Sequence, residues 1–201
     1  MRVQRRRLTP TQRAACAEQL ARRLASTPLF KRSRRIACYL PIDGELDPAP
    51  LIYRALAMKK SVYLPVLVPL GTRLGFIRYR PGDRLALNRY GIPEPTSGFH
   101  ARINPAALDL VLVPLVAFDS RGNRLGMGAG YYDRSFAYLK SRRHWNKPRL
   151  LGLAYEFQKV PRLPDKPWDV PLSGIATEKR VYTPAYELLA DEIRTQRFQR
   201  R

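Results

Sequence analysis

The stretch DLVLVPLVAFD, residues 109–119, is a continuous apolar run between two aspartates. Such a run without polar alternation is typical of a strand buried on both faces of a sheet. RLGMGAGYYDR, residues 124–134, follows it, with glycine at positions 126, 128 and 130. Beyond the glycines, Tyr131, Ser135, Tyr138 and Leu139 recur at helical spacing. The order of strand, glycine-rich loop and helix indicates an α/β fold.

The glycine-rich loop permits two interpretations. Closely spaced glycines indicate positive φ angles or a close approach to the main chain, and backbone N–H groups in such a loop can bind phosphate. The spacing matches neither standard phosphate-binding glycine motif, so a structural turn is an equal alternative. Asp133 favours phosphate, because a carboxylate beside bound phosphates can hold Mg²⁺.

The segments before this loop predict helices and strands in alternation. Thr9, Pro10 and Gln12 form the N-cap, first-turn proline and capping-box partner of a basic helix over residues 9–26. Its expected apolar stripe is Ala14, Ala17, Leu20, Ala21 and Leu24. Residues 36–42 predict a strand, residues 48–60 a helix and residues 61–67 a second strand. Such a β-α-β unit predicts a parallel strand pair.

The remaining segments complete the expected architecture. Strands are expected at residues 72–80 and 150–155, and irregular chain at the proline-rich residues 88–98 and 159–171. We predict a single three-layer α/β domain over residues 1–201, with a mainly parallel or mixed sheet flanked by helices. A basic tail is expected at about residues 191–201.

Composition limits the class of protein. The chain has 201 residues, of which 45% are hydrophobic and 26% charged, which is typical of a globular protein. The apolar run is far shorter than the roughly 20 residues that span a bilayer, and no secretory apolar region is present, so we expect a cytoplasmic protein that does not bind membranes. An organelle transit peptide, which is also rich in arginine and poor in acids, is the alternative for the first dozen residues. Cys16 and Cys38 are expected to be reduced, in or near the core. His100 and His144 have no second ligand at a useful spacing, so no transition-metal site is expected.

The basic charge also has two interpretations. The net charge is +21, and residues 1–35 carry eleven Lys or Arg against one acid. Solvated helix faces are favoured over a nucleic-acid footprint, because the cations are not interleaved with aromatic residues.

Four motifs in register add a family resemblance. They are GELD (44–47), NRYGIPEP (88–95), GNRLGMGAGYYDR (122–134) and PWDVPLSGIATEKRV (167–181). With them the chain resembles the 5-formyltetrahydrofolate cyclo-ligase family, also called methenyltetrahydrofolate synthetases, from about residue 8 to residue 182. The resemblance implies ATP- and Mg²⁺-dependent conversion of 5-formyltetrahydrofolate to 5,10-methenyltetrahydrofolate, ADP and phosphate, through a phosphorylated formyl group. The substrate expected from it is a folate, in polyglutamylated form if the basic surface contributes, and the protein is expected to be a monomer.

The resemblance also implies roles for individual residues. Arg124 and Tyr132 are the expected catalytic residues, and Asp133 and Asp169 the expected Mg²⁺ ligands. The folate is expected to contact Leu40, Glu45, Met127, Gly128, Ala129, Gly130 and Tyr131. The ATP is expected to contact Arg124, Leu125, Gly126, Met127, Gly128, Ala129, Gly130, Tyr131 and Tyr132.

The N-terminal segment departs from the family pattern. The family usually carries a Lys and an Arg four residues apart that reach ATP, upstream of the position matched by Leu8, Thr9 and Pro10. Either the natural start lies upstream of Met1, or Arg2 and Arg6, which share one helix face, substitute as ATP ligands.

Two alternatives to the cyclo-ligase remain at this point. One is an inactive cyclo-ligase fold that acts as a basic RNA-binding protein, and the other is an ATP-dependent kinase or ligase for a different small acid. Glu45 distinguishes the latter, because it belongs to the expected folate side of the site.

Overall fold

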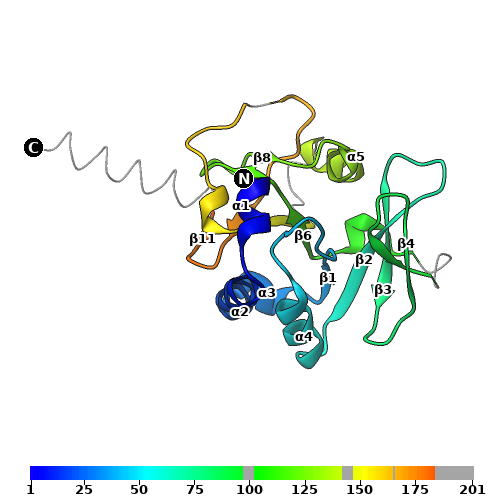
Figure 1. The fold of residues 1–201 in the computed structure, drawn as a ribbon. Coiled ribbons are helices and arrows are strands. Elements are labelled where there is room, and N and C mark those ends of the chain that lie inside the picture. Colours follow the sequence, from blue (N-terminus) through cyan, green and yellow to red (C-terminus); the bar gives the residue numbers. More distant parts are fainter. Residues whose placement is uncertain (97–101, 142–146, 165, 184–201) are drawn as a thin grey trace, which may run out of the picture.

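The computed structural model describes residues 1–96, 102–141, 147–164 and 166–183 (Figure 1). Its helices are α1 (Arg2–Arg7), α2 (Pro10–Ser26), α3 (Pro28–Arg32), α4 (Ala49–Ala57) and α5 (Tyr131–Phe136), with 3-10 turns η2 (Pro105–Ala107), η3 (Ala137–Ser141) and η4 (Glu156–Gln158). The seven strands of the main sheet are β1 (Arg35–Ala37), β2 (Ser61–Leu67), β3 (Leu74–Tyr79), β6 (Leu110–Pro114), β9 (Arg149–Leu153), β10 (Gly174–Ala176) and β11 (Val181–Tyr182). Two small hairpins pair β4 (Leu85–Leu87) with β5 (Pro93–Pro95) and β7 (Ala117–Phe118) with β8 (Arg124–Leu125).

The main sheet is mixed, with strand order β11-β10-β9-β6-β1-β2-β3. The five inner strands run parallel, and β3 and β11 pair antiparallel at the two edges. Helices α2, α3 and α4 cover one face and α5 the other (Figure 1). The predicted α/β class with a mixed sheet flanked by helices is therefore confirmed.

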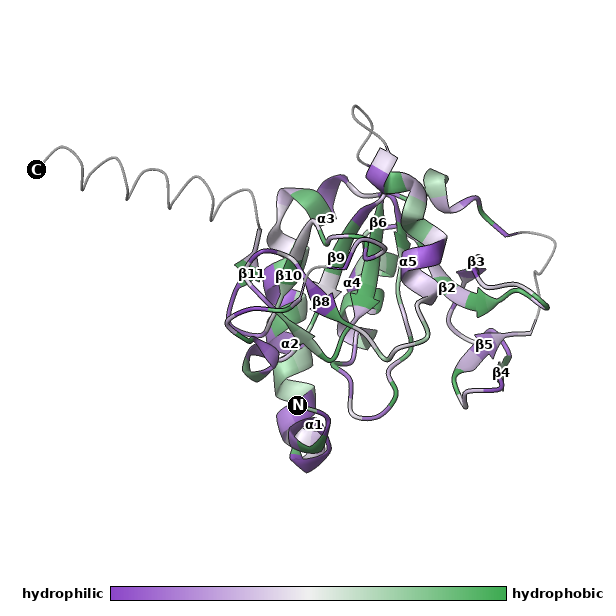
Figure 2. Ribbon diagram, turned by 90° about the horizontal axis from the view of Figure 1, so that it is seen from above, coloured by the Kyte–Doolittle hydropathy of each residue, from purple (hydrophilic) through white to green (hydrophobic). Residues whose placement is uncertain are grey.

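The core follows from the apolar central strands. Leu110, Leu112 and Leu151 pack toward α2 and α4, whereas Val111 and Val113 pack toward Phe136 of α5. Every side chain from Leu110 to Val113 is buried, as expected for a strand that is covered on both faces. Figure 2 shows the hydrophobic colour on β6 and β9, at the centre of the fold.

The β-α-β prediction is confirmed, with α4 connecting the parallel strands β1 and β2. The capping box of Thr9 and Gln12 also forms at the start of α2. Of the expected apolar stripe on α2, only Ala14 is exposed. Cys16 is partly buried and Cys38 is buried, and both are free, as predicted.

Three predicted segments differ from the structure. The first strand ends at Ala37 instead of continuing to residue 42, since the chain leaves the sheet before Pro41, which has no N–H to donate. The apolar run of residues 109–118 is divided into β6 and β7, with Leu115 and Val116 between them. Residues 88–98 were expected to be irregular, but Pro93–Pro95 forms β5, which pairs with β4.

Some predictions lie outside the described residues. They concern His100, His144 and the basic tail at residues 191–201. Within the part of the chain that the structure does describe, no helix has the length and apolar character to cross a bilayer.

Gly174 lets the edge strand β11 approach the sheet, and we expect Gly174→Ala to lower the free energy of unfolding by about 2 kcal/mol. A Cβ at this position would lie 2.6 Å from the Tyr182 carbonyl oxygen and 3.1 Å from Leu151 Cδ1. Urea titration measures the change. Gly126→Ala is the matched control, because a Cβ there meets no atom within 4 Å. Equal stability of the two variants would contradict the steric argument.

Candidate active site

A cleft of about 580 Å³ opens where the parallel strands β1 and β6 end. Carboxyl ends of parallel strands are the usual place for ligands in α/β folds. Tyr39, Leu40 and Ile42, just beyond β1, form one wall, and Pro114 at the end of β6 also lines the cleft. The other walls come from the glycine-rich loop, the β4–β5 hairpin and the proline-rich segment near residue 168.

The glycine-rich loop is held by a buried turn before it. Asp119 accepts hydrogen bonds from the backbone N–H groups of Arg121, Asn123 and Leu163, at 3.0 to 3.1 Å. Burial alone would raise the pKa of Asp119, but these hydrogen bonds outweigh it and lower the pKa. The β7–β8 hairpin thereby delivers Arg124 and the following glycines to the cleft at a fixed place.

The alternate glycines have a conformational and a steric explanation. Gly128 has φ +98° and Gly130 has φ +63°, which non-glycine residues rarely adopt. A Cβ at Gly126 or Gly128 would meet no atom within 4 Å, so the protein leaves the space beside this backbone open. The loop can therefore bring its main chain against a bound ligand.

A network of charged groups joins this loop to the proline-rich segment. Arg124 Nη2 donates to Asp133 Oδ1 at 2.6 Å, and Arg124 Nη1 donates to the Val170 carbonyl at 2.5 Å. The Val170 N–H donates to the same Asp133 oxygen at 3.0 Å. Only 6% of the Arg124 side chain and 22% of the Asp133 side chain are exposed. Asp169 lines the same cleft next to Val170, so both predicted metal ligands face one space.

Glu45 is the buried acid of the cleft, at 6% exposure. Its Oε2 accepts the Ile42 N–H at 3.2 Å. Burial raises the pKa of Glu45 to about 7, and the charge of nearby Asp43 adds to the increase. Desolvation likewise raises the pKa of the Tyr132 hydroxyl, with a further contribution from Glu45. The deep part of the cleft thus holds a carboxyl group that titrates near neutral pH beside a protonated phenol.

The predicted site residues converge in this cleft, with two exceptions. Those that line it are Leu40, Glu45, Arg124, Leu125, Gly126, Met127, Gly128, Ala129, Gly130, Tyr131, Tyr132, Asp133 and Asp169. Arg2 and Arg6 do not line it: their Nε atoms pair with Asp43 at 2.7 and 2.5 Å. Arg5, which is fully buried, pairs with Asp43 at 3.2 Å as well.

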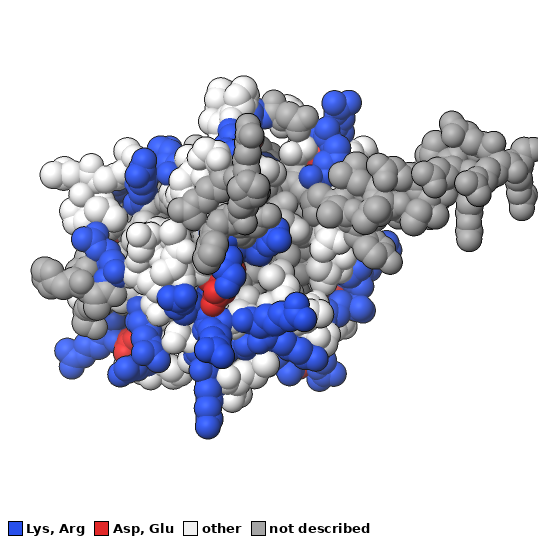
Figure 3. Space-filling view, turned by 180° about the vertical axis from the view of Figure 1, so that it is seen from behind, with Lys and Arg blue, Asp and Glu red and all other residues white. Residues whose placement is uncertain are grey.

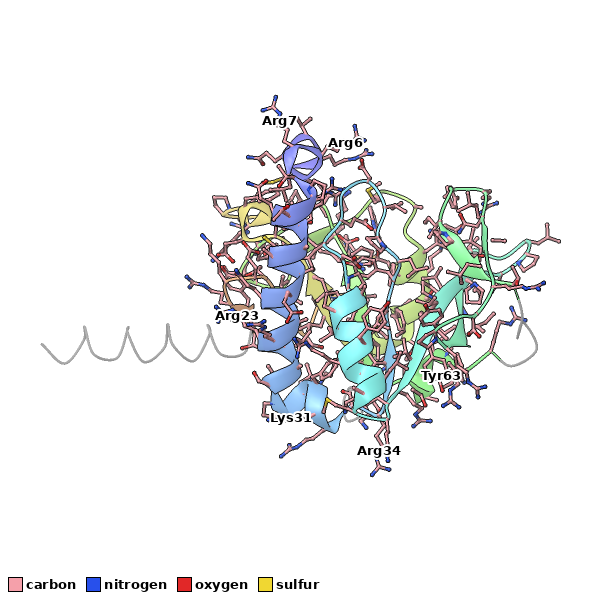
Figure 4. All side chains as sticks on the ribbon, turned by 60° about the horizontal axis from the view of Figure 1, so that its bottom comes forward. Arg6, Arg7, Arg23, Lys31, Arg34 and Tyr63 are labelled. Carbon is pink, nitrogen blue, oxygen red and sulfur yellow. The ribbon has the colours of Figure 1, made fainter. Side chains whose placement is uncertain are left out.

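Three of the four arginines of α1 therefore contact the loop that carries Asp43 and Glu45. Hydrogen bonds from Arg6 and Arg2 lower the pKa of Asp43 to about 2. Figure 4 shows Arg6 and Arg7 on α1 at the end of the molecule, whereas Arg23, Lys31 and Arg34 project outward elsewhere.

Sequence reasoning did not single out four further lining residues as site residues. They are Asn88, Tyr90 and Glu94 of the β4–β5 hairpin and Trp168 of the proline-rich segment. Trp168 is 66% exposed and Tyr90 50% exposed. The sequence carries a signal for them, since these residues lie in the family motifs NRYGIPEP and PWDVPL, in which only Asp169 is expected to contact a ligand.

Comparison with known proteins assigns the family. The model of the "5-formyltetrahydrofolate cyclo-ligase family" matches residues 1–178. The chain belongs to the 5-formyltetrahydrofolate cyclo-ligase family. It is accordingly a ligase. The 5-formyltetrahydrofolate cyclo-ligase of Escherichia coli K12 is 39% identical over 183 residues, covering 90% of this chain and 98% of that protein. The Haemophilus influenzae cyclo-ligase is 40% identical over 148 residues, covering 72% of this chain and 76% of that protein.

Solved structures agree with this membership. The NMR structure of Aquifex aeolicus 5,10-methenyltetrahydrofolate synthetase superimposes with a TM-score of 0.76 at 37% identity, covering 91% of this chain and 88% of that one. The Mycoplasma pneumoniae 5,10-methenyltetrahydrofolate synthetase gives a TM-score of 0.66 at 25% identity, covering 88% and 93%. This chain therefore has the fold of these solved synthetases, and the cleft described above lies within that fold.

Proposed function

We propose that this cyclo-ligase converts 5-formyltetrahydrofolate and ATP to 5,10-methenyltetrahydrofolate, ADP and phosphate. The observation that carries the proposal is the convergence of a buried acid, an open glycine-rich loop and two aspartates in one cleft. A site for one small molecule would not need both a buried carboxyl group and a loop open to an anion.

The reaction requires activation of an unreactive amide. The formyl oxygen attacks the γ-phosphorus of ATP, and ADP leaves. N10 of the folate then attacks the resulting iminium carbon, the C–O bond breaks, phosphate departs and N10 loses its proton. Positioning and charge neutralisation dominate such a phosphoryl transfer, which suits a cleft that offers no Cys or His nucleophile among its lining residues.

Different residues of the cleft are proposed to bind the folate, bind the phosphates and exclude water. In the proposal, Glu45 accepts hydrogen bonds from the pterin, and Leu40, in the segment after β1, packs on it. The loop from Gly126 to Gly130 donates backbone N–H groups to the phosphates, and Arg124 neutralises their charge. Tyr131 and Tyr132 close the loop end of the cleft and exclude water from the phosphorylated intermediate.

The two aspartates fit a magnesium ion. Asp133 Oδ1 accepts two hydrogen bonds, whereas no described residue donates to Asp133 Oδ2, and Asp169 lines the same space. Mg²⁺ usually takes one or two carboxylates, with phosphates and waters as its other ligands. No group of three or more His, Cys, Asp or Glu with metal-site geometry occurs in the described part of the chain, so the proposal assigns only these two carboxylates to the ion. The ion would neutralise charge on the transferring phosphoryl group.

We retain Arg2 and Arg6 as proposed ATP ligands, on the condition that ATP can compete with Asp43 for them. Both now pair with Asp43, so a triphosphate would have to share or replace that carboxylate. Arg2, Arg5 and Arg6 outnumber their single acid three to one, which leaves positive charge for an incoming anion.

The alternative of an inactive RNA-binding protein is not favoured. Figure 3 shows Lys and Arg side chains spread over the face opposite to that in Figure 1. Such spreading is typical of solvated helix faces. The residues to which we assign chemical roles instead line one cleft.

The absorbance of methenyltetrahydrofolate in the near ultraviolet tests the proposed reaction. We expect the purified protein to produce an absorbance rise from 5-formyltetrahydrofolate only when both ATP and Mg²⁺ are present. EDTA in excess, or replacement of ATP by its β,γ-imido analogue, should abolish the rise. A rise without nucleotide, or none with it, would contradict the proposal.

A further inference from the structure

The β4–β5 hairpin is fixed against the sheet at the outer end of the cleft. Glu94 Oε1 accepts the Leu67 N–H of β2 at 2.8 Å and the Asn88 side-chain amide at 2.7 Å. Asn88 Oδ1 in turn accepts the N–H groups of Tyr90 and Ile92, at 2.9 and 3.1 Å. The tip, where Arg89 lies, is therefore held in one conformation.

Arg89 is held at the rim by two phenols that line the cleft. Its guanidinium lies 5.1 Å from the centre of the Tyr90 ring and donates to the Tyr131 hydroxyl at 2.5 Å. The Tyr90 and Tyr131 rings meet edge to face with centroids 6.1 Å apart. Tyr131 follows Gly130 directly, so this contact joins the hairpin to the glycine-rich loop. The Arg89 side chain is exposed, which leaves further N–H donors for a ligand.

The other cations in or beside the cleft have partners of their own. Arg124 pairs with Asp133, and Arg134 donates to the carbonyl groups of Thr72 and Ala129. Lys166, which lines the cleft, places its ammonium group 5.8 Å from the centre of the Trp168 ring. Arg89 at the rim pairs with no carboxylate in the described parts of the chain, and its contacts are with Tyr90 and Tyr131.

We propose that Arg89 binds the glutamate carboxylate of the folate substrate. This inference rests on the proposed function. A folate carries its pterin at one end and an anionic glutamate at the other, with an aminobenzoyl ring between them. With the pterin beside the buried Glu45, the glutamate points out of the cleft, where Arg89 offers a planar donor pair that matches a carboxylate. Tyr90 and Tyr131 then provide aromatic contacts for the aminobenzoyl ring.

A substrate that lacks the glutamate distinguishes glutamate binding by Arg89 from a purely structural role of Arg89. Arg89→Gln is expected to raise KM for 5-formyltetrahydrofolate about tenfold, the loss typical of one charged hydrogen bond. KM for 5-formyltetrahydropteroate, which lacks the glutamate, should not change, and neither should KM for ATP. The wild-type preference for the glutamate form should also weaken at high salt, because the rim is exposed to solvent.

Arg84→Gln is the matched control, since Arg84 is an exposed arginine beside the same hairpin whose side chain has no contact with Tyr90 or Tyr131 among the described residues. It should leave all three KM values as they are. An equal loss for both folate substrates in Arg89→Gln would overturn the proposal and make Arg89 a support for Tyr131 only. A selective loss in Lys166→Gln instead would also overturn it.

Calorimetric measurement of folate binding without ATP distinguishes a failure of the Arg89 proposal from a failure of the proposed reaction. If the wild-type protein does not turn over, the proposed function fails. The ratio of the dissociation constants for 5-formyltetrahydrofolate and 5-formyltetrahydropteroate would then still report on Arg89. A ratio that is the same in the wild type and in Arg89→Gln would contradict the glutamate site by itself.

Discussion

Asp133→Asn is expected to lower the rate of ATP-dependent methenyltetrahydrofolate formation by at least about 100-fold, comparable to removal of one group that stabilises transition-state charge. Asp133 offers one oxygen without a hydrogen-bond donor among the described residues, beside the open glycine-rich loop. An amide keeps the shape of that group but is a much weaker ligand for Mg²⁺, which prefers charged oxygen. Steady-state rates over a range of Mg²⁺ concentrations measure the effect, and we expect excess Mg²⁺ to restore part of the lost activity.

The same variant should remain folded. The amide side chain that replaces the carboxylate can still accept hydrogen bonds from Arg124 and from the Val170 N–H, because both donate to a single oxygen, which the amide retains. Circular dichroism and the midpoint of thermal unfolding check this. Asp83→Asn is the control: Asp83 accepts the Arg80 N–H in an exposed turn and does not line the cleft, so its rate should be normal. A normal rate in Asp133→Asn would remove Asp133 from the metal site.

The parts of the fold that sequence predicted correctly are those with local signals. The capping box of Thr9 and Gln12, the alternation that places α4 between β1 and β2, and the uniform apolar character of residues 110–113 each depend on neighbours in the chain. The positive φ angles expected at the glycines are also found, at Gly128 and Gly130. Local chemistry therefore specified the centre of the sheet and the loop.

The parts that sequence did not predict depend on distant partners. Strands β10 and β11 are only three and two residues long, and each depends on a partner, since β10 pairs with β9 and β11 pairs with β10. Pro93–Pro95 becomes a strand by pairing with Leu85–Leu87 despite its two prolines, which lie in a two-stranded hairpin at the margin of the fold. The pairing of Arg2, Arg5 and Arg6 with Asp43 joins segments far apart in the chain and has no sequence signature.

Glu45→Gln is expected to remove a pH dependence of stability that the wild-type protein shows. Burial raises the folded-state pKa of Glu45 to about 7, from a value of 4.5. The native state therefore binds more protons than the unfolded state between these values, and the free energy of unfolding falls as pH rises through that window. The full difference is about 3 kcal/mol at 1.36 kcal/mol per pKa unit, present below pH 4.5 and lost above pH 7.

Urea titrations of both proteins at pH 5 and pH 8 measure this term. At pH 5 the two should be similar in stability, whereas at pH 8 Glu45→Gln should be the more stable, because it buries no charge. Glu18→Gln is the control, since its carboxylate is partly exposed and its pKa is lowered by Arg22, so it should not be stabilised at pH 8.

Although Glu45→Gln should be more stable at pH 8, we expect it to bind 5-formyltetrahydrofolate at least about tenfold more weakly, with an unchanged KM for ATP. A cost in stability retained for binding is typical of a functional site. If Glu45→Gln bound folate normally and showed the wild-type pH dependence, Glu45 would be neither the folate ligand nor the buried acid of the cleft.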